Sequence, residues 1–180
     1  IYIRNWPKKL NDYKIVQISD LHLGSFGSVD KLEKVVKIIN EEYADLIVFT
    51  GDLVNNYYYE VLPYIKTLKK LKAKDGKLSI LGNHDYGDYT GKKRDSREWK
   101  ENFNNLIQIQ KDAGFQLLLN EAITINKHGN LFNIIGVENW GAGNFNKDGN
   151  IDIAIQNIDL SLSNILLSHD PSHWSHIILE

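Results

Sequence analysis

Short apolar runs alternate with amphipathic segments over the first two thirds of the chain. The apolar runs are rich in β-branched residues and short enough to be buried strands, whereas the segments between them repeat apolar residues at helical spacing. Strands are predicted over residues 14–19, 46–50 and 77–81, and helices over residues 29–43, 57–71 and 97–113. Strands that alternate with helices predict parallel pairing through right-handed crossovers.

The last third of the chain has a different pattern. Three apolar runs follow one another with short connections at residues 115–119, 122–126 and 131–137, and a fourth lies at residues 164–167 after a short helix predicted at 151–157. Such hairpin-like strands predict a second or mixed sheet. The expected fold class is therefore α/β (α+β), with two packed mixed β-sheets flanked by helices in a four-layer αββα sandwich.

Composition narrows the classes of protein that fit. The chain has 180 residues, of which 42% are hydrophobic and 24% charged, as in a globular domain with a sizeable core. Its formal net charge of -2 gives no general attraction to nucleic acid, and no segment has the run of about 20 apolar residues that a membrane helix needs. The absence of cysteine excludes disulfides, thiolate metal sites and cysteine nucleophiles.

Polar clusters follow four of the predicted strands. The clusters are Asp20-Leu21-His22, Gly51-Asp52, Gly82-Asn83-His84-Asp85 and His169-Asp170. Ligands of parallel α/β sheets bind beyond the carboxyl ends of the strands, so we expect these side chains to converge. Carboxylate, amide and imidazole groups together suit Mn, Fe or Zn. The sequence therefore predicts a metal centre at this sheet edge.

The four clusters, in this order, resemble the motifs of the calcineurin-like metallophosphoesterases over essentially the whole chain. The resemblance implies two divalent metal ions (Mn, Fe or Zn) that activate water for attack on a phosphomonoester, phosphodiester or pyrophosphate. It implies these roles: Asp20 and His22 at the first ion, Asp52 bridging both ions, Asn83 and His169 at the second ion, His84 donating a proton to the leaving oxygen, and Asp85 orienting His84. The runs at residues 19–24 and 167–171 are similar to a branch with membrane-associated and lipid-pyrophosphate-cleaving members.

The chain departs from the family pattern near its end. The family motifs finish with Gly-His-x-His, whereas His173 and His176 are three residues apart and lack the preceding glycine. The chain also begins with Ile1 and contains no methionine. We therefore expect a single domain over residues 1–180 that lacks its C-terminal portion. This segment alone is expected to bind metal weakly, to bind one ion, or to be inactive.

Substrate contacts are expected outside the metal motifs. Lys92, Lys93 and Arg94 follow the Asn83 cluster in a polar loop, where a phosphate-bearing substrate or an anionic membrane surface could bind them, and His173 is a further candidate for a substrate contact. Tyr57, Tyr58 and Tyr59 either line a pocket or pack internally. The expected partner is a phosphate-containing small molecule or lipid, with membrane association through segments outside this chain. The oligomeric state is left open.

Two other functions are compatible with the sequence. A non-catalytic binding module on the same scaffold would explain the missing final motif. A nuclease of the same fold would need a basic groove, to which the net charge of -2 gives little support.

Overall fold

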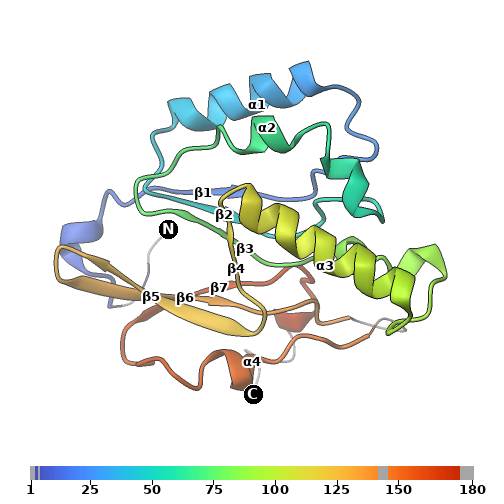
Figure 1. Cartoon of the computed structure of the whole chain (residues 1–180). Coiled ribbons are helices and arrows are strands. Elements are labelled where there is room, and N and C mark those ends of the chain that lie inside the picture. The colour runs from blue at the N-terminus through green and yellow to red at the C-terminus, as the bar shows by residue number, and fades with distance from the viewer. Residues whose placement is uncertain (1–2, 4, 142–145, 175–180) are drawn as a thin grey trace. The chain divides into compact units, whose positions relative to one another are not determined.

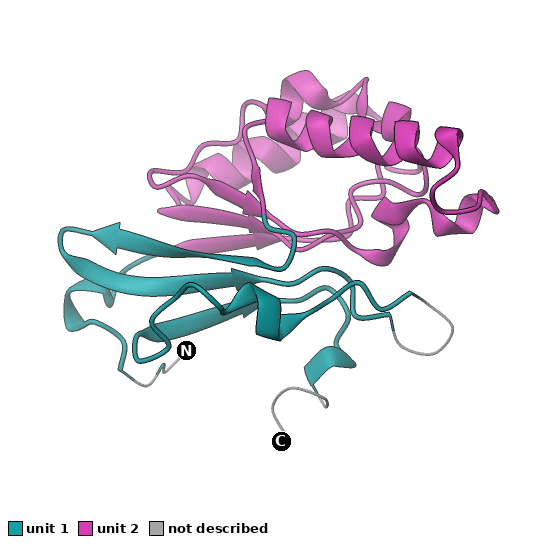
Figure 2. Ribbon diagram, turned by 60° about the horizontal axis from the view of Figure 1, so that its bottom comes forward, with its two compact units in different colours: residues 1–13, 118–180 teal, residues 14–117 magenta. Residues whose placement is uncertain are grey.

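The computed structural model describes residue 3, residues 5–141 and residues 146–174 (Figure 1). The chain divides into two compact units, shown in different colours in Figure 2. We call residues 14–117 the parallel-sheet unit, and residues 1–13 with 118–180 the mixed-sheet unit.

The parallel-sheet unit contains a four-stranded sheet in the order β1-β2-β3-β4, with every neighbouring pair parallel. Its strands are β1 (Ile15–Ile18), β2 (Leu46–Phe49), β3 (Lys77–Ser79) and β4 (Gln116–Leu117). Its helices are α1 (Val29–Glu41), α2 (Ile65–Leu68) and α3 (Arg97–Asp112), with 3₁₀ turns η2 (Tyr58–Val61), η3 (Asn83–Tyr86) and η4 (Asp88–Thr90). The three helices lie on one side of this sheet (Figure 1). The parallel pairing predicted from the sequence is confirmed.

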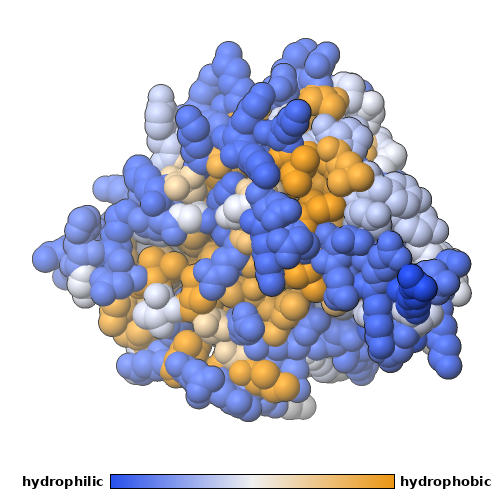
Figure 3. Space-filling model, in the orientation of Figure 1, coloured by the Kyte–Doolittle hydropathy of each residue, from blue (hydrophilic) through white to orange (hydrophobic). Residues whose placement is uncertain are grey.

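Helices α1 and α3 begin and pack as their sequences predict. The Ser28 and Ser96 hydroxyls accept hydrogen bonds from backbone N–H groups in the first turns of α1 and α3. Leu32 and Val36 of α1, and Leu106 and Ile109 of α3, belong to the core of this unit. The top of Figure 3, over α1, is mostly hydrophilic, although Ile38 of this helix is exposed. Burial of one apolar stripe therefore fixes each helix on the sheet.

Two predicted elements of this unit differ in the structure. Instead of one helix over residues 57–71, the chain forms the short elements η2 and α2 on either side of Pro63. Proline lacks a backbone N–H and disfavours helical geometry in the residue before it, so the segment breaks there. The run at 115–119, expected beside the later strands, instead supplies β4 at the edge of the parallel sheet. This sheet is therefore parallel rather than mixed.

The mixed-sheet unit contains β5 (Glu121–Lys127), β6 (Asn130–Gly136) and β7 (Ser163–Leu167). Strands β5 and β6 form an antiparallel hairpin, whereas β7 pairs with β6 in parallel, so this sheet is mixed as expected. The unit also contains α4 (Ile151–Ala154) and η1 (Lys8–Leu10). Phe132 is fully buried, with the rings of Trp6 and Tyr13 at centroid distances of 4.9 and 5.1 Å. In the part of the chain that the structure describes, no helix has the length and apolar character to cross a membrane.

Candidate active site

The predicted ligands of the parallel-sheet unit come from loops at one edge of its sheet. Asp20 follows β1, Asp52 follows β2, and Asn83 opens η3 just after β3. The first two loops are joined by backbone hydrogen bonds: Asp20 N–H donates to Gly51 O at 3.0 Å and His22 N–H donates to Asp52 O at 3.1 Å. Parallel pairing of adjacent strands thus places residues distant in sequence side by side, as the strand-end pattern predicts.

Three of these residues have backbones in the left-handed region. The φ angles are 55° at Asp20, 43° at His22 and 59° at Asp52. Residues other than glycine are uncommon there, and such conformations persist only where the surrounding structure enforces them. Their concentration at the ends of two adjacent strands indicates that the fold tolerates local strain to aim these side chains at a common point.

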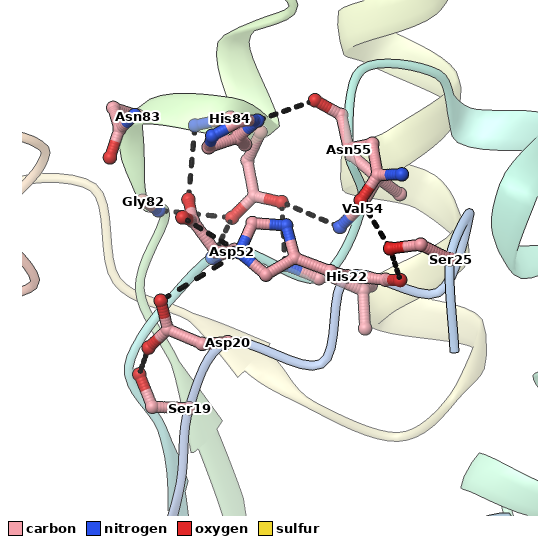
Figure 4. A network of polar contacts seen from close by, with 12 residues as sticks. Ser19, Asp20, His22, Ser25, Asp52, Val54, Asn55, Gly82, Asn83 and His84 are labelled. Atoms are coloured by element: carbon pink, nitrogen blue, oxygen red, sulfur yellow. Dashed lines mark hydrogen bonds and ion pairs between the residues drawn. The ribbon is translucent and has the colours of Figure 1, made fainter.

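The side chains of Asp20, His22 and Asp52 meet around the imidazole of His22. Its Nε2 lies 3.8 Å from Asp20 Oδ1 and 3.5 Å from Asp52 Oδ2, contacts drawn in Figure 4. A cation held about 2.0–2.2 Å from each ligand separates neighbouring ligand atoms by about 3–4 Å, so these spacings fit a shared ion. The Asp52 side chain is only 5% exposed, whereas that of Asp20 is 55% exposed. The donor atoms thus suit a divalent cation with one side open to solvent.

His84 joins this cluster from the neighbouring loop. Potential ligand atoms of His22, Asp52 and His84 all lie within 4.8 Å of one another. The His84 Nδ1 atom lies 2.7 Å from the carbonyl oxygen of Asn55, which can only accept, so the ring proton sits on Nδ1. This contact leaves Nε2 for the reacting group, which suits the proton-donor role that the family resemblance implies.

Asp85 has a different contact from the one expected. Its carboxylate accepts hydrogen bonds from the backbone N–H groups of Asp52, Leu53 and Gly82 at 2.8–2.9 Å, and from Val54 N–H at 3.4 Å. Complete burial raises the pKa of Asp85 to about 7. The charge of Asp52 also raises this pKa, whereas the backbone N–H groups of Gly82, Asp52 and Leu53 lower it.

The expectation that Asp85 orients the His84 ring is therefore wrong: the ring contacts Asn55 O instead. Residues 83–86 form a 3₁₀ turn, whose successive side chains point about 120° apart, so neighbours in sequence cannot share one direction. Asp85 instead ties the loop after β2 to the loop after β3. It is a structural clamp on the backbone that presents Asp52 and His84.

Two residues that the sequence interpretation missed hold the loop after Asp52. The Glu60 carboxylate accepts from the N–H groups of Asn55 at 2.6 Å, Tyr57 at 3.0 Å and Asn56 at 3.2 Å. Asn102 of α3 donates to Asn56 O and accepts from Tyr58 N–H. A glutamate placed three residues after the start of a helical turn is a capping signal, and it could have identified Glu60. Together these contacts fix the carbonyl that holds His84.

Glu60 also explains the glycine that follows the Asp20-x-His22 motif. A Cβ atom at Gly24 would lie 2.4 Å from Glu60 Oε2 and 2.9 Å from Asn55 Nδ2. Because three N–H groups hold the carboxylate, it cannot move aside without releasing the loop. We expect Gly24→Ala to lower the free energy of unfolding by about 1–3 kcal/mol, measured by urea denaturation. Asn104→Ala, at an exposed position of α3, should stay within about 0.5 kcal/mol, and equal effects of the two substitutions would contradict the proposed close approach.

The expected substrate contacts separate into two groups. Lys92 and Lys93 are exposed, as a substrate contact requires. Arg94 instead forms a two-pronged ion pair with Asp88, at 2.8 and 2.6 Å, and its guanidinium lies 4.8 Å from the Tyr86 ring centroid. These contacts assign Arg94 a structural role in the loop. The three tyrosines at 57–59 line a pocket of about 140 Å³ together with Lys92 and Trp99.

The structure bears differently on the roles predicted for the histidines of the mixed-sheet unit. His173 is only 1% exposed, stacks on Trp140 at 4.5 Å, and places Nδ1 3.3 Å from Ser168 Oγ. This burial argues against the expected substrate contact. His169 follows β7, and its place in the metal centre stays a prediction. His176 lies outside the described residues.

Comparison with known proteins supports the sequence interpretation. A model of the calcineurin-like phosphoesterase family matches residues 13–178. YkuE of Bacillus subtilis, an uncharacterised metallophosphoesterase, is 46% identical over 85 residues, which are 46% of this chain and 30% of that protein. An uncharacterised metallophosphoesterase of Aquifex aeolicus is 30% identical over 168 residues, covering 91% of this chain and 57% of that protein.

A relative with an assigned activity is also similar. The UDP-2,3-diacylglucosamine pyrophosphatase LpxG of Chlamydia trachomatis is 30% identical over 214 residues, covering 96% of this chain and 63% of that protein. The chain thus spans less than two thirds of the length of each of these three relatives.

Proposed function

Because the chain belongs to the calcineurin-like phosphoesterase family, we propose that the protein is a metal-dependent hydrolase of phosphoesters or phosphoanhydrides with a dinuclear centre. The observation that supports this most directly is the convergence of Asp20, His22 and Asp52 from two strand ends, at ligand-like spacings and with left-handed backbones. A cluster built at the cost of backbone strain is typical of a functional site.

We assign the ligands as follows. Asp20 and His22 would hold one ion, Asp52 would bridge, and Asn83 with His169 would hold the other. Divalent ions at such a centre supply a nucleophile from water at neutral pH and neutralise charge on the phosphate. The carboxylate, amide and imidazole donors suit Mn, Fe or Zn without selecting among them.

His84 would act on the leaving group. The Asn55 carbonyl holds its Nδ1–H, so the opposite nitrogen can carry a second proton toward the departing oxygen. Proton donation of this kind contributes about 10²–10⁴-fold to the rate. The rigid loop behind it, held by Asp85 and Glu60, keeps the imidazole in one orientation.

For the substrate, we propose a pyrophosphate or phosphoester attached to a larger group, such as a nucleotide-linked lipid. The support is the similarity to LpxG, whose name describes a pyrophosphatase of a diacylated UDP-sugar. The exposed Lys92 and Lys93, close in sequence to His84, would attract an anionic substrate. Association with a membrane through segments outside this chain belongs to the same proposal.

Metal removal tests the proposal. The full-length protein should lose hydrolysis of bis(4-nitrophenyl) phosphate, 4-nitrophenyl phosphate or a UDP-linked pyrophosphate after EDTA treatment, and should regain it when Mn²⁺ is added. Metal content by mass spectrometry should be two ions per chain. Metal binding without hydrolysis of any substrate would favour the non-catalytic binding module, whereas no binding and no hydrolysis would refute the dinuclear centre.

A further inference from the structure

Tyr89 contacts both groups that the proposed function places at the second ion and at the leaving group. Its ring stacks on the His84 imidazole with a centroid distance of 4.4 Å and an interplanar angle of 28°. Its hydroxyl accepts a hydrogen bond of 2.6 Å from the side-chain Nδ2 of Asn83. Neither the motif pattern nor the family match assigns a role to this tyrosine, which is half exposed beside the cluster.

The contact with Asn83 bears on metal ligation. An asparagine amide offers an oxygen that can bind a cation and an NH₂ group that cannot, and rotation about its last bond exchanges the two. The Tyr89 hydroxyl contacts Nδ2, so the amide turns its oxygen, the atom that can bind a cation, away from this hydroxyl. Such partners of ligating side chains fix ligand orientation and typically change metal affinity or activity by about 10–100-fold.

The contact with His84 bears on proton donation. The ring is held at Nδ1 by Asn55 O and meets the edge of His22 at 4.8 Å, while Tyr89 covers one of its faces. A stacked aromatic ring restricts tilting of the imidazole. The hydrogen bond at Nδ1 therefore restricts rotation of the imidazole within its plane, and the Tyr89 ring restricts tilting out of that plane.

The backbone around Tyr89 is held firmly enough to make these contacts specific. The side chain of the neighbouring Asp88 accepts two hydrogen bonds from Arg94. Gly87 has a φ angle of 69°, and a Cβ there would lie 2.9 Å from Asn102 Nδ2 and 3.1 Å from Asn56 O. The turn before Tyr89 thus packs tightly against the loop that supplies the Asn55 carbonyl. Arg94, for which a substrate contact was one of the alternatives from the sequence, contributes to this turn through its ion pair with Asp88.

We propose that Tyr89 is a positioning residue that aligns the Asn83 amide for the second metal ion and the His84 imidazole for the leaving group. The inference rests on the proposed function and adds a residue to it. The inference has two parts, because the Tyr89 hydroxyl hydrogen-bonds to Asn83 whereas the Tyr89 ring stacks on His84.

Two substitutions in the full-length protein test the two parts. Tyr89→Phe keeps the ring and removes the hydroxyl, so binding of the second Mn²⁺ in calorimetric titration should weaken by about 10-fold. The ratio of kcat for phenyl phosphate to kcat for 4-nitrophenyl phosphate should stay as in the wild type. Tyr89→Leu removes both contacts, so that ratio should also fall by about 10-fold, because the poorer leaving group depends more on proton donation.

Matched controls come from Tyr43, which is 77% exposed after the end of α1. Tyr43→Phe and Tyr43→Leu should leave both the Mn²⁺ titration and the leaving-group ratio unchanged. An active wild type, with Tyr89 variants that match it in both measurements, would overturn the inference and leave the proposed function intact. A wild type without metal-dependent hydrolysis would overturn the proposed function, and the inference with it.

Discussion

Asp52→Asn is expected to lower kcat/KM of the full-length protein by about 10³-fold, the largest loss from any single isosteric change in the cluster. Metal ions supply several kcal/mol of transition-state stabilisation, and each 1.36 kcal/mol corresponds to a factor of ten. Asp52 is the most buried of the three clustered ligands and lies 3.5 Å from His22. Water therefore has the least access to this position and cannot compensate for the loss of the Asp52 charge. Steady-state hydrolysis of bis(4-nitrophenyl) phosphate in saturating Mn²⁺ measures the loss.

The same substitution should not unfold the protein. Asparagine tolerates the left-handed backbone of residue 52 at least as well as aspartate, and its Oδ1 can still accept from His84 N–H. Thermal unfolding of the metal-free variant should therefore match or exceed that of the wild type, as expected where a charged site is kept for function. The exposed Asp12→Asn serves as control and should keep full activity. Activity within tenfold of wild type in Asp52→Asn would remove Asp52 from the bridging position.

Most of the parallel-sheet unit could be predicted from sequence because its signals are local. Residues 46–49 are apolar throughout, as a strand buried on both faces requires, and β2 is buried at every position. The polar residues directly after such runs could be placed at one sheet edge by the parallel topology alone. The positions of Asp20, Asp52 and Asn83 after successive strands follow from these two facts.

The remaining differences have non-local causes. Strand β4 is two residues long, and its pairing with β3 rather than with the later strands depends on backbone contacts that no short pattern encodes. His173 lies near strand-end motifs, yet a stack on Trp140 buries it. Helix spacing in residues 57–71 favoured one helix, but Pro63 interrupts it.

The residues that support the site could not be identified from the sequence for a different reason. Asp85 belongs to a recognisable motif, but the direction of its side chain depends on the 3₁₀ geometry of residues 83–86. Tyr89 and Glu60 have ordinary side chains whose importance comes from which atoms they touch across a turn. Residue type predicts which groups can bind a cation, whereas the partners that aim those groups become evident only in three dimensions.

Asp85→Asn is expected to cost about 3–5 kcal/mol of unfolding free energy, because one amide cannot replace a carboxylate among converging donors. Both oxygens of Asp85 accept backbone N–H groups, and the residue is fully buried. An asparagine would satisfy donors with Oδ1 alone and would turn its own NH₂ toward the others, leaving buried N–H groups unpaired at about 1–3 kcal/mol each. The melting temperature, followed by circular dichroism, should fall by roughly 10 °C.

A matched control separates this effect from the general loss of a buried aspartate. Asp45 is also buried in the parallel-sheet unit, where it accepts from Lys14 N–H at 2.9 Å and pairs with the exposed Lys74 at 3.0 Å. In Asp45→Asn the amide oxygen can keep the backbone bond, and the ion pair with Lys74 that is lost is screened by solvent, so the cost should be about 1 kcal/mol. Unfolding free energies that fall equally in the two variants would show that Asp85 does not clamp the loops. A much larger loss at Asp85, accompanied by weaker Mn²⁺ binding, would show that the backbone presenting Asp52 and His84 depends on this carboxylate.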